Sequence, residues 1–323
     1  MYLVTGGGGF IGSHLVRALV QRGMHVRVLD NNTSGNRQRI TDILREIEWI
    51  DGDIRDAETL CKVCQGVEVI LHQAAVASVP RSIAEPEMTH ATNITGTLNV
   101  LLAARNMGVR RVVFASSSAV YGNLPGTPKT ETIPTQPLSP YGVQKLAAES
   151  YCRIWHTLYG VETVALRYFN VFGPAQDLQS EYAAVIPRFI SAVVEGRTPV
   201  VYGDGEQSRD FIYISNVIDV NLLAATVPGA AGQVINVGTG EKITLNHLLA
   251  ELGRIAEQPI HAAYEAARPG DVRESLPDIS RMRSVLGYEP AVSFAEGLAV
   301  TFQTYKQALA GQLNWSEPVL QRS

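Results

Sequence analysis

The chain has 323 residues, of which 46% are hydrophobic and 18% charged, and its formal net charge is −4. This composition is typical of a globular protein with one large domain or two lobes. It argues against nucleic acid and membrane as partners, because there is no basic run and no apolar run near the ~20 residues that span a bilayer. No signal peptide is visible before the first strand, so we expect a cytoplasmic protein.

The first predicted elements are a strand over residues 2–5, a glycine turn and a helix over residues 13–22. Gly6, Gly9 and Gly12 are spaced three apart in that turn. A strand, a glycine turn and a helix N-terminus form a place where a pyrophosphate can approach backbone amides. The alternative is a tight turn that binds nothing.

Two acidic residues follow the next two strands. Asp30 ends a strand over residues 26–30, about 20 residues after the glycines, where a carboxylate can accept from a ribose 2′-hydroxyl. Because this carboxylate would repel a 2′-phosphate, NAD is favoured over NADP. Asp53 follows the third strand and can bond an adenine amine, although it can also be an ordinary turn residue.

The cysteines do not predict a metal site. Cys61 and Cys64 form a C-x-x-C within a predicted helix over residues 57–65, and Cys152 is the other cysteine. A structural zinc site needs about four ligands, and the sequence has no second cysteine pair. We therefore expect packing thiols.

The fourth predicted strand, residues 67–72, ends in His72, which we interpret as structural. It is followed by small residues, Ala74 and Ala75, which let the backbone lie against a nicotinamide ribose. A long helix over residues 87–106 contains Asn93, expected as a buried polar tie to the active-site strands.

Three serines, residues 116–118, follow the carboxyl end of the fifth predicted strand, residues 110–115. Open α/β sheets bind ligands at that edge. Ser118 and the helix that begins near Tyr141 are therefore expected to face the same cavity as the glycine turn.

Tyr141 and Lys145 lie four residues apart in a helix that Ser139 and Pro140 are expected to open. A phenol has a pKa near ~10, so a base that works near neutral pH needs it lowered by roughly 3 units, or about 4 kcal/mol. One cation ~4–6 Å away supplies about 3–4 kcal/mol at an effective dielectric of ~20. The pair is thus a candidate base, and its alternative is an ordinary surface pair.

A series of motifs runs in order along the chain: residues 5–12 (TGGGGFIG), 30–32 (DNN), 52–54 (GDI), 116–122 (SSSAVYG), 141–145 (YGVQK), 167–174 (RYFNVFGP), 208–210 (SRD) and 268–271 (RPGD). With these motifs the chain resembles the extended short-chain dehydrogenases/reductases, and specifically nucleotide-sugar 4-epimerases of the UDP-glucose 4-epimerase type. The resemblance covers nearly the whole chain.

The resemblance implies an α/β fold: a Rossmann-like doubly wound parallel sheet in residues 1–168 and a smaller mixed α/β substrate lobe in residues 169–323. A strand near residues 233–238 is expected to return to the sheet. Bound NAD, a UDP-sugar substrate and a homodimer of paired helices are also implied. In the second half, Pro187 is expected to start a helix, and Ser293 and Glu296 form a capping box.

The resemblance also assigns site residues. Cofactor contacts are assigned to Gly6, Gly9, Phe10, Ile11, Gly12, Asp30, Asn31, Asn32, Ser34, Gly35, Asp53, Ile54, Gln73, Ala74, Ala75, Ala77, Asn93, Ser116, Tyr141, Lys145, Tyr168 and Val171. Substrate contacts are assigned to Ser78, Val79, Ser118, Tyr141, Asn170, Val185, Pro187, Tyr202, Arg209, Arg268, Asp271 and Ser275. Two guanidiniums suit a diphosphate, although Arg209 can instead be a surface ion pair with Asp210.

The activity implied is reversible inversion at C4 of a UDP-hexose. Tyr141 as phenolate takes the C4 hydroxyl proton while hydride passes to NAD⁺. Lys145 lowers the tyrosine pKa and anchors the nicotinamide ribose, and Ser118 bonds O4.

Three alternatives to epimerisation are a 4,6-dehydratase, a decarboxylase and a catalytically silent NAD-sensing scaffold. Related 4,6-dehydratases carry Asp-Glu after the catalytic Ser or Thr, and related decarboxylases carry a Glu there, whereas Ala119 and Val120 follow Ser118 here. A silent NAD-sensing scaffold should have lost Tyr141, Lys145 or Ser118, and all three residues are present here.

The sugar itself is left open. Ser275 falls where the family gates the C2 side of the sugar, and a small serine there leaves room for an N-acetyl group. Residues 77–82 also resemble the loop of epimerases that act on UDP-N-acetylglucosamine. We therefore expect both plain and N-acetylated UDP-hexoses to fit, and UDP-glucuronate stays open because Arg81 or Arg188 can meet a carboxylate.

Overall fold

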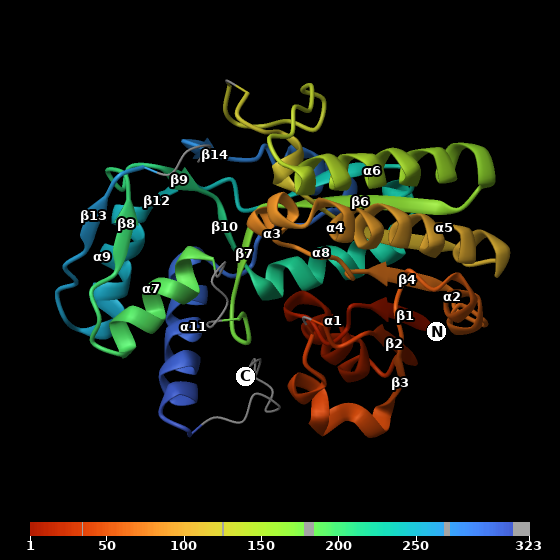
Figure 1. The fold of residues 1–323 in the computed structure, drawn as a ribbon, viewed down its shortest axis with the longest axis horizontal. Helices are drawn as coiled ribbons and strands as arrows, with labels where there is room; N and C mark the ends of the chain where they lie inside the picture. Colours follow the sequence, from red (N-terminus) through yellow and green to blue (C-terminus); the bar gives the residue numbers. More distant parts are fainter. Residues whose placement is uncertain (34, 125, 178–183, 268–271, 313–323) are drawn as a thin grey trace.

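The structure is a computed structural model that describes residues 1–33, 35–124, 126–177, 184–267 and 272–312 (Figure 1). Its centre is a seven-stranded sheet in the order β11-β6-β5-β4-β1-β2-β3, and every neighbouring pair is parallel. Most of these strands are apolar runs buried on both faces, as parallel sheets require. The strands are β1 (Tyr2–Thr5), β2 (Val26–Asp30), β3 (Ile47–Asp51), β4 (Val69–His72), β5 (Arg111–Ser117), β6 (Glu162–Tyr168) and β11 (Val234–Val237).

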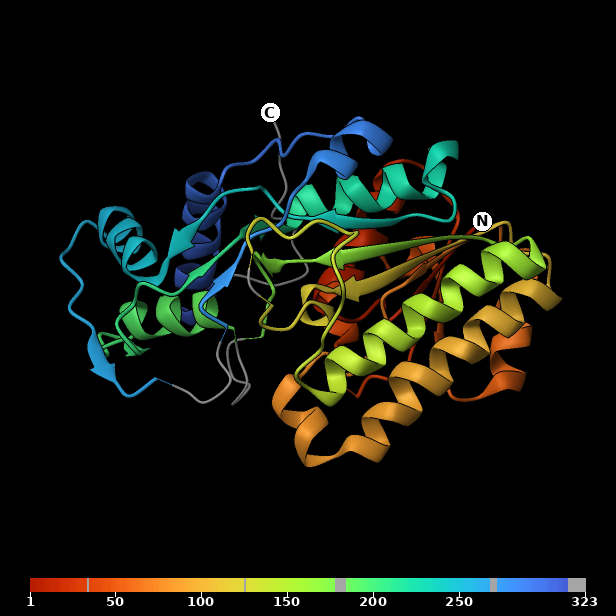
Figure 2. The same ribbon diagram turned by 90° about the horizontal axis from the view of Figure 1, so that it is seen from above.

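Helices cover both faces of this sheet, which makes it a doubly wound, Rossmann-like fold (Figures 1 and 2). One face carries α1 (Phe10–Gln21) and α8 (Ile214–Thr226). The other carries α2 (Ala57–Val63), α5 (Thr97–Asn106) and α6 (Pro140–Tyr159).

The expected long helix over residues 87–106 is present as three consecutive segments. It consists of α4 (Pro86–His90), a π-helical turn η2 (Ala91–Gly96) and α5. Such π turns are frequent at functional sites. Shorter segments elsewhere are η1 (Arg37–Glu46), α3 (Val79–Ala84), η3 (Ser118–Val120) and η4 (Pro228–Ala230).

The second half of the chain builds a smaller lobe of short strands and helices, to the left of the sheet in Figure 1. Its strands pair as β7 (Asn170–Phe172) with β10 (Phe211–Tyr213), β8 (Val200–Tyr202) with β13 (Ala263–Glu265), and β9 (Ser208–Arg209) with β12 (Ile243–Thr244) and β14 (Glu274–Ser275). Its helices are α7 (Val185–Val194), α9 (Leu245–Ala256), α10 (Ser280–Leu286) and α11 (Phe294–Leu309). One hydrophobic cluster runs from β1 and α1 through α8 to α11 and joins the lobe to the sheet.

Local sequence signals explain several helix ends. Ser139 accepts from the Gly142 amide at 3.2 Å to cap α6, and Gly160 ends that helix with φ 70°. Ser293 and Glu296 form the expected capping box at α11. Two expected starts are wrong: α1 begins at Phe10, so Gly12 lies inside the helix, and α7 begins at Val185, so Pro187 is its third residue.

Candidate active site

A cavity of about 350 Å³ lies between the carboxyl end of β5 and strands β9 and β14. Five predicted substrate residues line it: Val79, Ser118, Asn170, Arg209 and Ser275. Its other lining residues are Ile83, Ala119, Tyr121, Gly122, Lys129, Leu138, Ser139, Phe169, Val272 and Glu274. We call this space the chamber.

Lys145 lies in the second turn of α6 and is almost fully buried. Its Nζ donates to the Ala115 carbonyl at 2.7 Å and lies 5.8 Å from the centre of the Tyr141 ring. Burial lowers the pKa of Lys145 to about 8, and the neighbouring Cys152 and Glu149 oppose this shift. The lysine is thus held at the end of β5, close to the tyrosine.

Tyr141 differs from the expectation, because burial raises the pKa of its phenol and only a hydrogen bond with Ser117 opposes the rise. The prediction that Lys145 lowers this pKa is therefore wrong for this structure. The physical reason is geometric: the ammonium is bonded to Ala115 O and faces the ring rather than the hydroxyl.

The serine in contact with the tyrosine is not the one that the sequence suggested. Ser117, the last residue of β5, is the side chain whose interaction lowers the pKa of the Tyr141 phenol, whereas Ser118 begins η3 and lines the chamber. The Ser117 hydroxyl also accepts from the Ala119 amide at 3.2 Å, which fixes its position. The structure thus points to Ser117 as the hydroxyl that can share a proton with the phenol.

A buried charge network ties α6 to the sheet behind this pair. Glu149 accepts from Arg167 at 2.9 and 2.8 Å and from the Ser116 hydroxyl, and all three side chains are buried. The Ser116 side chain is therefore not available to a cofactor, contrary to its assignment. Its role in the structure is to hold β5 and α6 together.

The glycine turn forms a cradle at the carboxyl edge of β1. A Cβ on Gly12 would lie 2.0 Å from the Gly6 carbonyl oxygen, and one on Gly6 would lie 2.7 Å from the Ala74 nitrogen. Gly9 caps α1 without a side-chain hydrogen bond, and the first turn of α1 holds no acidic residue. The open amides at this helix N-terminus fit a pyrophosphate, so the residues present fit NAD.

Asp30 lies beside this cradle and is almost completely buried. Its carboxylate accepts from the amides of Gly8 and Asn32, each at 2.8 Å, and Gly35 packs against it. Carboxylate oxygens have further lone pairs, so ribose hydroxyls can still bond there. Ser34, the neighbouring predicted contact, lies outside the described residues.

Asp53 is engaged by two neighbours. Arg55 forms an ion pair with it at 2.7 Å, and Asn31 donates to it at 2.7 Å. These bonds, above all that from Arg55, lower the pKa of Asp53 to about 2. The next residue, Ile54, is buried and would meet a Cβ on Gly96, so its side chain belongs to the core.

Two further residues assigned to the cofactor have side chains that are hydrogen-bonded to other residues of the protein. Asn93 donates to Val76 O and to Gln144 Oε1 and accepts from Val76 N, so it ties the loop after β4 to α6 rather than to the strands. Tyr168 is buried and donates to Asn221 Oδ1 at 2.9 Å. Both residues can position the site without touching the cofactor.

The loop after β4 and strand β7 hold the other assigned positions. Gln73 donates to the Tyr168 hydroxyl and to Asn221. Ala74 donates its amide to Thr5 Oγ1 at 3.3 Å, Ala77 is exposed, and Val171 lies within β7. The backbone of this loop therefore lies directly beside the glycine cradle.

The substrate assignments are spread over the smaller lobe. Ser78 caps α3, and Arg188 on α7 lies over the Tyr202 ring at 5.7 Å, which brings the start of α7 near β8. Arg268 and Asp271 lie outside the described residues.

The alternative ion pair between Arg209 and Asp210 is not formed, since Asp210 is fully buried. Its carboxylate accepts from the backbone of Thr239, Gly240 and Glu241. Arg209 instead lines the chamber.

Sequence reasoning missed Lys129, which lines the chamber with only 4% of its surface exposed. No motif marks this residue, because its burial comes from backbone bonds to residues 276 and 278, far along the chain. The two arginines proposed for a carboxylate do not line the chamber: Arg81 pairs with Glu85 at 3.4 Å, and Arg188 stacks on Tyr202.

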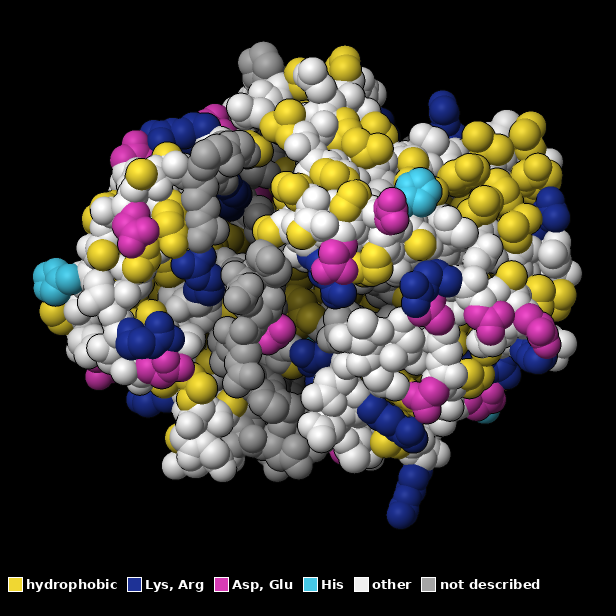
Figure 3. All heavy atoms as spheres, in the orientation of Figure 1, with side chains coloured by type: hydrophobic (Ala, Val, Ile, Leu, Met, Phe, Trp, Pro, Cys, Tyr) yellow, Lys and Arg dark blue, Asp and Glu magenta, His cyan; other side chains and the backbone are white. Residues whose placement is uncertain are grey.

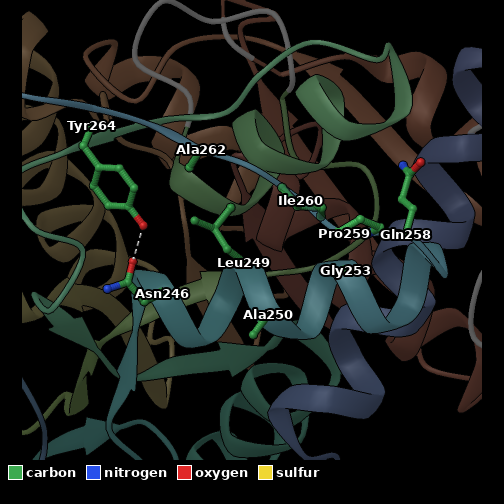
Figure 4. A pocket seen from close by; sticks show the side chains of 9 residues that line it. All are labelled: Asn246, Leu249, Ala250, Gly253, Gln258, Pro259, Ile260, Ala262 and Tyr264. Atoms are coloured by element: carbon green, nitrogen blue, oxygen red, sulfur yellow. Dashed lines mark hydrogen bonds between the residues drawn. The ribbon is translucent and has the colours of Figure 1, made fainter.

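A larger cavity of about 550 Å³ lies beside α9 and shares no lining residue with the chamber (Figure 4). Its polar groups are few, and Tyr264 donates to Asn246 at 2.8 Å, so the two satisfy one another. Neither a charged side chain nor a predicted site residue lines it. We therefore place the chemistry at the chamber.

Other candidates have structural roles. His72 is buried between the hydroxyls of Thr5 and Thr97, at 2.7 and 3.0 Å, as expected. The three cysteines are free thiols, and Cys64 and Cys152 pack in the core. In the described ranges there is no group of His, Cys, Asp and Glu that could hold a metal, and no helix suited to crossing a membrane.

Known proteins resemble the chain along almost its full length. The profile of the NAD dependent epimerase/dehydratase family matches residues 2–238. The chain is 37% identical over 308 residues to a UDP-glucose 4-epimerase of Mycolicibacterium smegmatis, which covers 94% of this chain and 98% of that protein.

Two solved structures agree with this fold. The first is a UDP-N-acetylglucosamine 4-epimerase from Methanobrevibacter ruminantium in complex with UDP-N-acetylmuramic acid, with a TM-score of 0.91, 42% identity and coverage of 95% of this chain and 98% of that one. The second is a UDP-glucose 4-epimerase of Thermus thermophilus in complex with NAD, with a TM-score of 0.86, 35% identity and coverage of 95% and 99%.

Similar proteins also include other activities. A UDP-N-acetyl-alpha-D-glucosaminuronate decarboxylase of Bacillus cytotoxicus is 32% identical over 319 residues, which cover 94% of this chain and 97% of that protein. A dTDP-glucose 4,6-dehydratase of Streptomyces niveus is 35% identical and covers 98% of this chain and 95% of that protein. The reaction therefore has to be argued from the site.

Proposed function

The chain belongs to the NAD dependent epimerase/dehydratase family, and within it we propose a UDP-sugar 4-epimerase, which inverts the C4 hydroxyl of a UDP-hexose. The observation that carries the proposal is the chamber itself, where Ser118 at the end of β5 and Ser139 at the start of α6 meet Asn170 and Arg209 of the smaller lobe. Tyr141 and Lys145 lie on α6 directly after Ser139. Epimerisation by oxidation and reduction needs one group that moves a proton at the C4 hydroxyl, and it needs no further acid or base.

NAD would be held by the glycine cradle, the first turn of α1 and Asp30. Bound NAD supplies reversible hydride transfer at C4 of the sugar. The protein's own task is to move the hydroxyl proton, and we assign it to the Tyr141 phenol. The interaction with Ser117 favours the phenolate against the effect of burial. Lys145 Nζ lies 5.8 Å from the centre of the phenol ring and donates to the Ala115 carbonyl, so it holds the end of β5 beside the tyrosine.

A dehydratase or a decarboxylase would need a carboxylate beside the reacting carbon. If Ser117 rather than Ser118 is the reference serine, the two following residues are Ser118 and Ala119, and neither is acidic. Around the chamber, the described wall contains one carboxylate, Glu274, and it is paired with Lys242. This supports epimerisation over elimination or decarboxylation.

The substrate range follows from the chamber wall. Ser275 on β14 lines the chamber, and its small side chain leaves space for a 2-acetamido group. We therefore assign both plain and N-acetylated UDP-hexoses as substrates. A Ser275→Tyr variant should lose turnover of UDP-N-acetylglucosamine before that of UDP-glucose.

The experiment that tests the function is incubation of the purified protein with UDP-glucose and UDP-N-acetylglucosamine, with products identified by NMR. We expect the corresponding galacto-configured products. Tyr141→Phe should lose turnover by a factor of roughly 100 or more, because it removes the proton-transfer group, and should still bind NAD. Undiminished turnover in this variant would refute the assigned base.

We also propose a homodimer through α6. The exposed side chains on this helix include Val143, Ile154 and Leu158, which are 51%, 39% and 69% exposed. Figure 3 shows hydrophobic side chains gathered over the region of α5 and α6. An apolar helix face of this kind is stabilised by burial against a second copy.

A further inference from the structure

Lys129 is hydrogen-bonded through both its amide and its carbonyl, and it forms part of the chamber wall. Its amide donates to Leu276 O at 2.8 Å, and its carbonyl accepts from Asp278 N and from Asn236 Nδ2, each at 2.8 Å. The residue is 4% exposed and shares the chamber wall with Ser118 and Asn170. The ammonium therefore has little freedom to reach solvent.

The charge of Lys129 is poorly compensated. An ammonium carries three N–H donors, and one of them bonds the Leu124 carbonyl. Within the described ranges Lys129 takes part in no ion pair, and the nearby Glu274 is held by Lys242 and Thr127. Burial lowers the pKa of Lys129, and Glu274 opposes this shift. A buried cation that has a single acceptor among the described residues is costly unless a ligand supplies a further acceptor.

The chemistry of the expected ligand limits which group can be the acceptor for the Lys129 ammonium. If the chamber holds the hexose, as the proposed function requires, the groups near Lys129 are those of the sugar. Sugar hydroxyls are neutral, whereas a carboxylate matches both the charge and the donors of an ammonium. We infer that Lys129 binds a carboxylate carried by the hexose, so that the protein accepts UDP-sugar acids in addition to neutral UDP-sugars.

The test measures binding rather than turnover, so that it does not depend on the reaction. The protein loaded with NAD is titrated in a calorimeter with UDP, UDP-glucose, UDP-glucuronate and UDP-N-acetylmuramate. The last two carry the carboxylate on C6 and on a lactyl ether, and they distinguish where it lies. Lys129→Gln removes the charge but can still donate to Leu124 O, and Lys129→Met removes both. Lys62→Gln, on the exposed surface of α2, is the control for net charge.

In Lys129→Gln, we expect Kd to rise about 10-fold or more for at least one acidic sugar, the size of a charged hydrogen bond. Kd for UDP and UDP-glucose should change by less than about 3-fold on the same scale, and Lys62→Gln should change none of them. A similar loss for all four ligands, in Lys129→Gln or Lys129→Met, would overturn the inference, because the lysine would then hold the diphosphate or the fold. Unchanged binding of both acids would overturn it as well.

The two proposals fail in different ways. If UDP-glucose binds the unaltered protein but Lys129 has no effect on the acids, only the role of Lys129 is refuted. If no UDP-sugar binds the unaltered protein, the proposed function is refuted and the role of Lys129 with it.

Discussion

Ser117 and Ser118 are adjacent, yet they face different surroundings. Ser117 lowers the pKa of the Tyr141 phenol against the effect of burial, and Ser118 lines the chamber. We predict that Ser117→Ala lowers kcat of epimerisation by roughly 10- to 100-fold, because a hydroxyl that aids proton transfer is lost. Ser118→Ala should act mainly on KM. Steady-state kinetics of both variants with UDP-glucose test this prediction. A loss of kcat in Ser118→Ala, with mainly a change of KM in Ser117→Ala, would instead assign the proton-transfer role to Ser118.

His72 gives the protein a pH-dependent stability. Burial lowers the pKa of His72 to about 3, so the folded protein keeps it neutral, whereas the unfolded chain protonates it below ~6.5. The contribution of His72 to the free energy of unfolding is thus fully present above pH ~6.5. It is lost as the pH falls below this value, by about 1.4 kcal/mol per pH unit. His14, whose pKa burial lowers to about 4, adds to the same slope.

We therefore predict that His72→Gln flattens this dependence. The glutamine can bond Thr5 and Thr97 but does not titrate. Urea unfolding at pH 7 and pH 5.5 measures the difference in free energy of unfolding, which should shrink in the variant. An equal difference in both proteins would mean that His72 does not titrate with folding.

The sequence predicted the single residues that belong to local motifs and missed those placed by distant contacts. Gly9, Asp30 and Tyr141 each lie at a strand or helix end that the hydrophobic pattern marks. Lys129 has no such marker, because residues 276 and 278 bury it. The different surroundings of Ser117 and Ser118 were hidden for a similar reason, since β5 extends two residues beyond the predicted strand.

At the scale of elements, α6 is fastened to β6 by the Glu149–Arg167 pair and to β5 by the bond from Ser116 to Glu149. Removing one partner leaves a buried charge unpaired. We predict that Glu149→Gln lowers the free energy of unfolding by roughly 3 kcal/mol or more. Glu68→Gln breaks an exposed pair with Arg110 and should cost less than ~1 kcal/mol. Denaturant melts of both variants test this, and equal small effects would show that the buried pair is replaceable.

Element types followed from hydrophobic periodicity where elements are long, as in α6 and β5. The short strands β9, β12 and β14 have two residues each, too few for any period to be read. The π-helical turn at Ala91–Gly96 was also hidden, because its sequence reads as an ordinary helix. These elements are defined by their tertiary partners rather than by their own residues.

For the whole molecule, the proposed homodimer predicts that the unaltered protein has the mass of two chains in solution. Leu158→Arg places a charge in the exposed apolar face of α6, so a dimer held there should dissociate. Light scattering during size exclusion should then report half the mass of the unaltered protein. Leu309→Arg, on the exposed face of α11, is the matched control and should leave the mass unchanged. A monomer in the unaltered protein would refute the proposal.

The strand β11 has a consequence for synthesis. It pairs with β6 through residues 234–237, although β6 itself ends at residue 168. While the ribosome has released only the first two hundred residues, β6 therefore presents an unpaired edge, which is a template for aggregation. The nascent sheet is completed only when β11 emerges, a late step with a long loop to close.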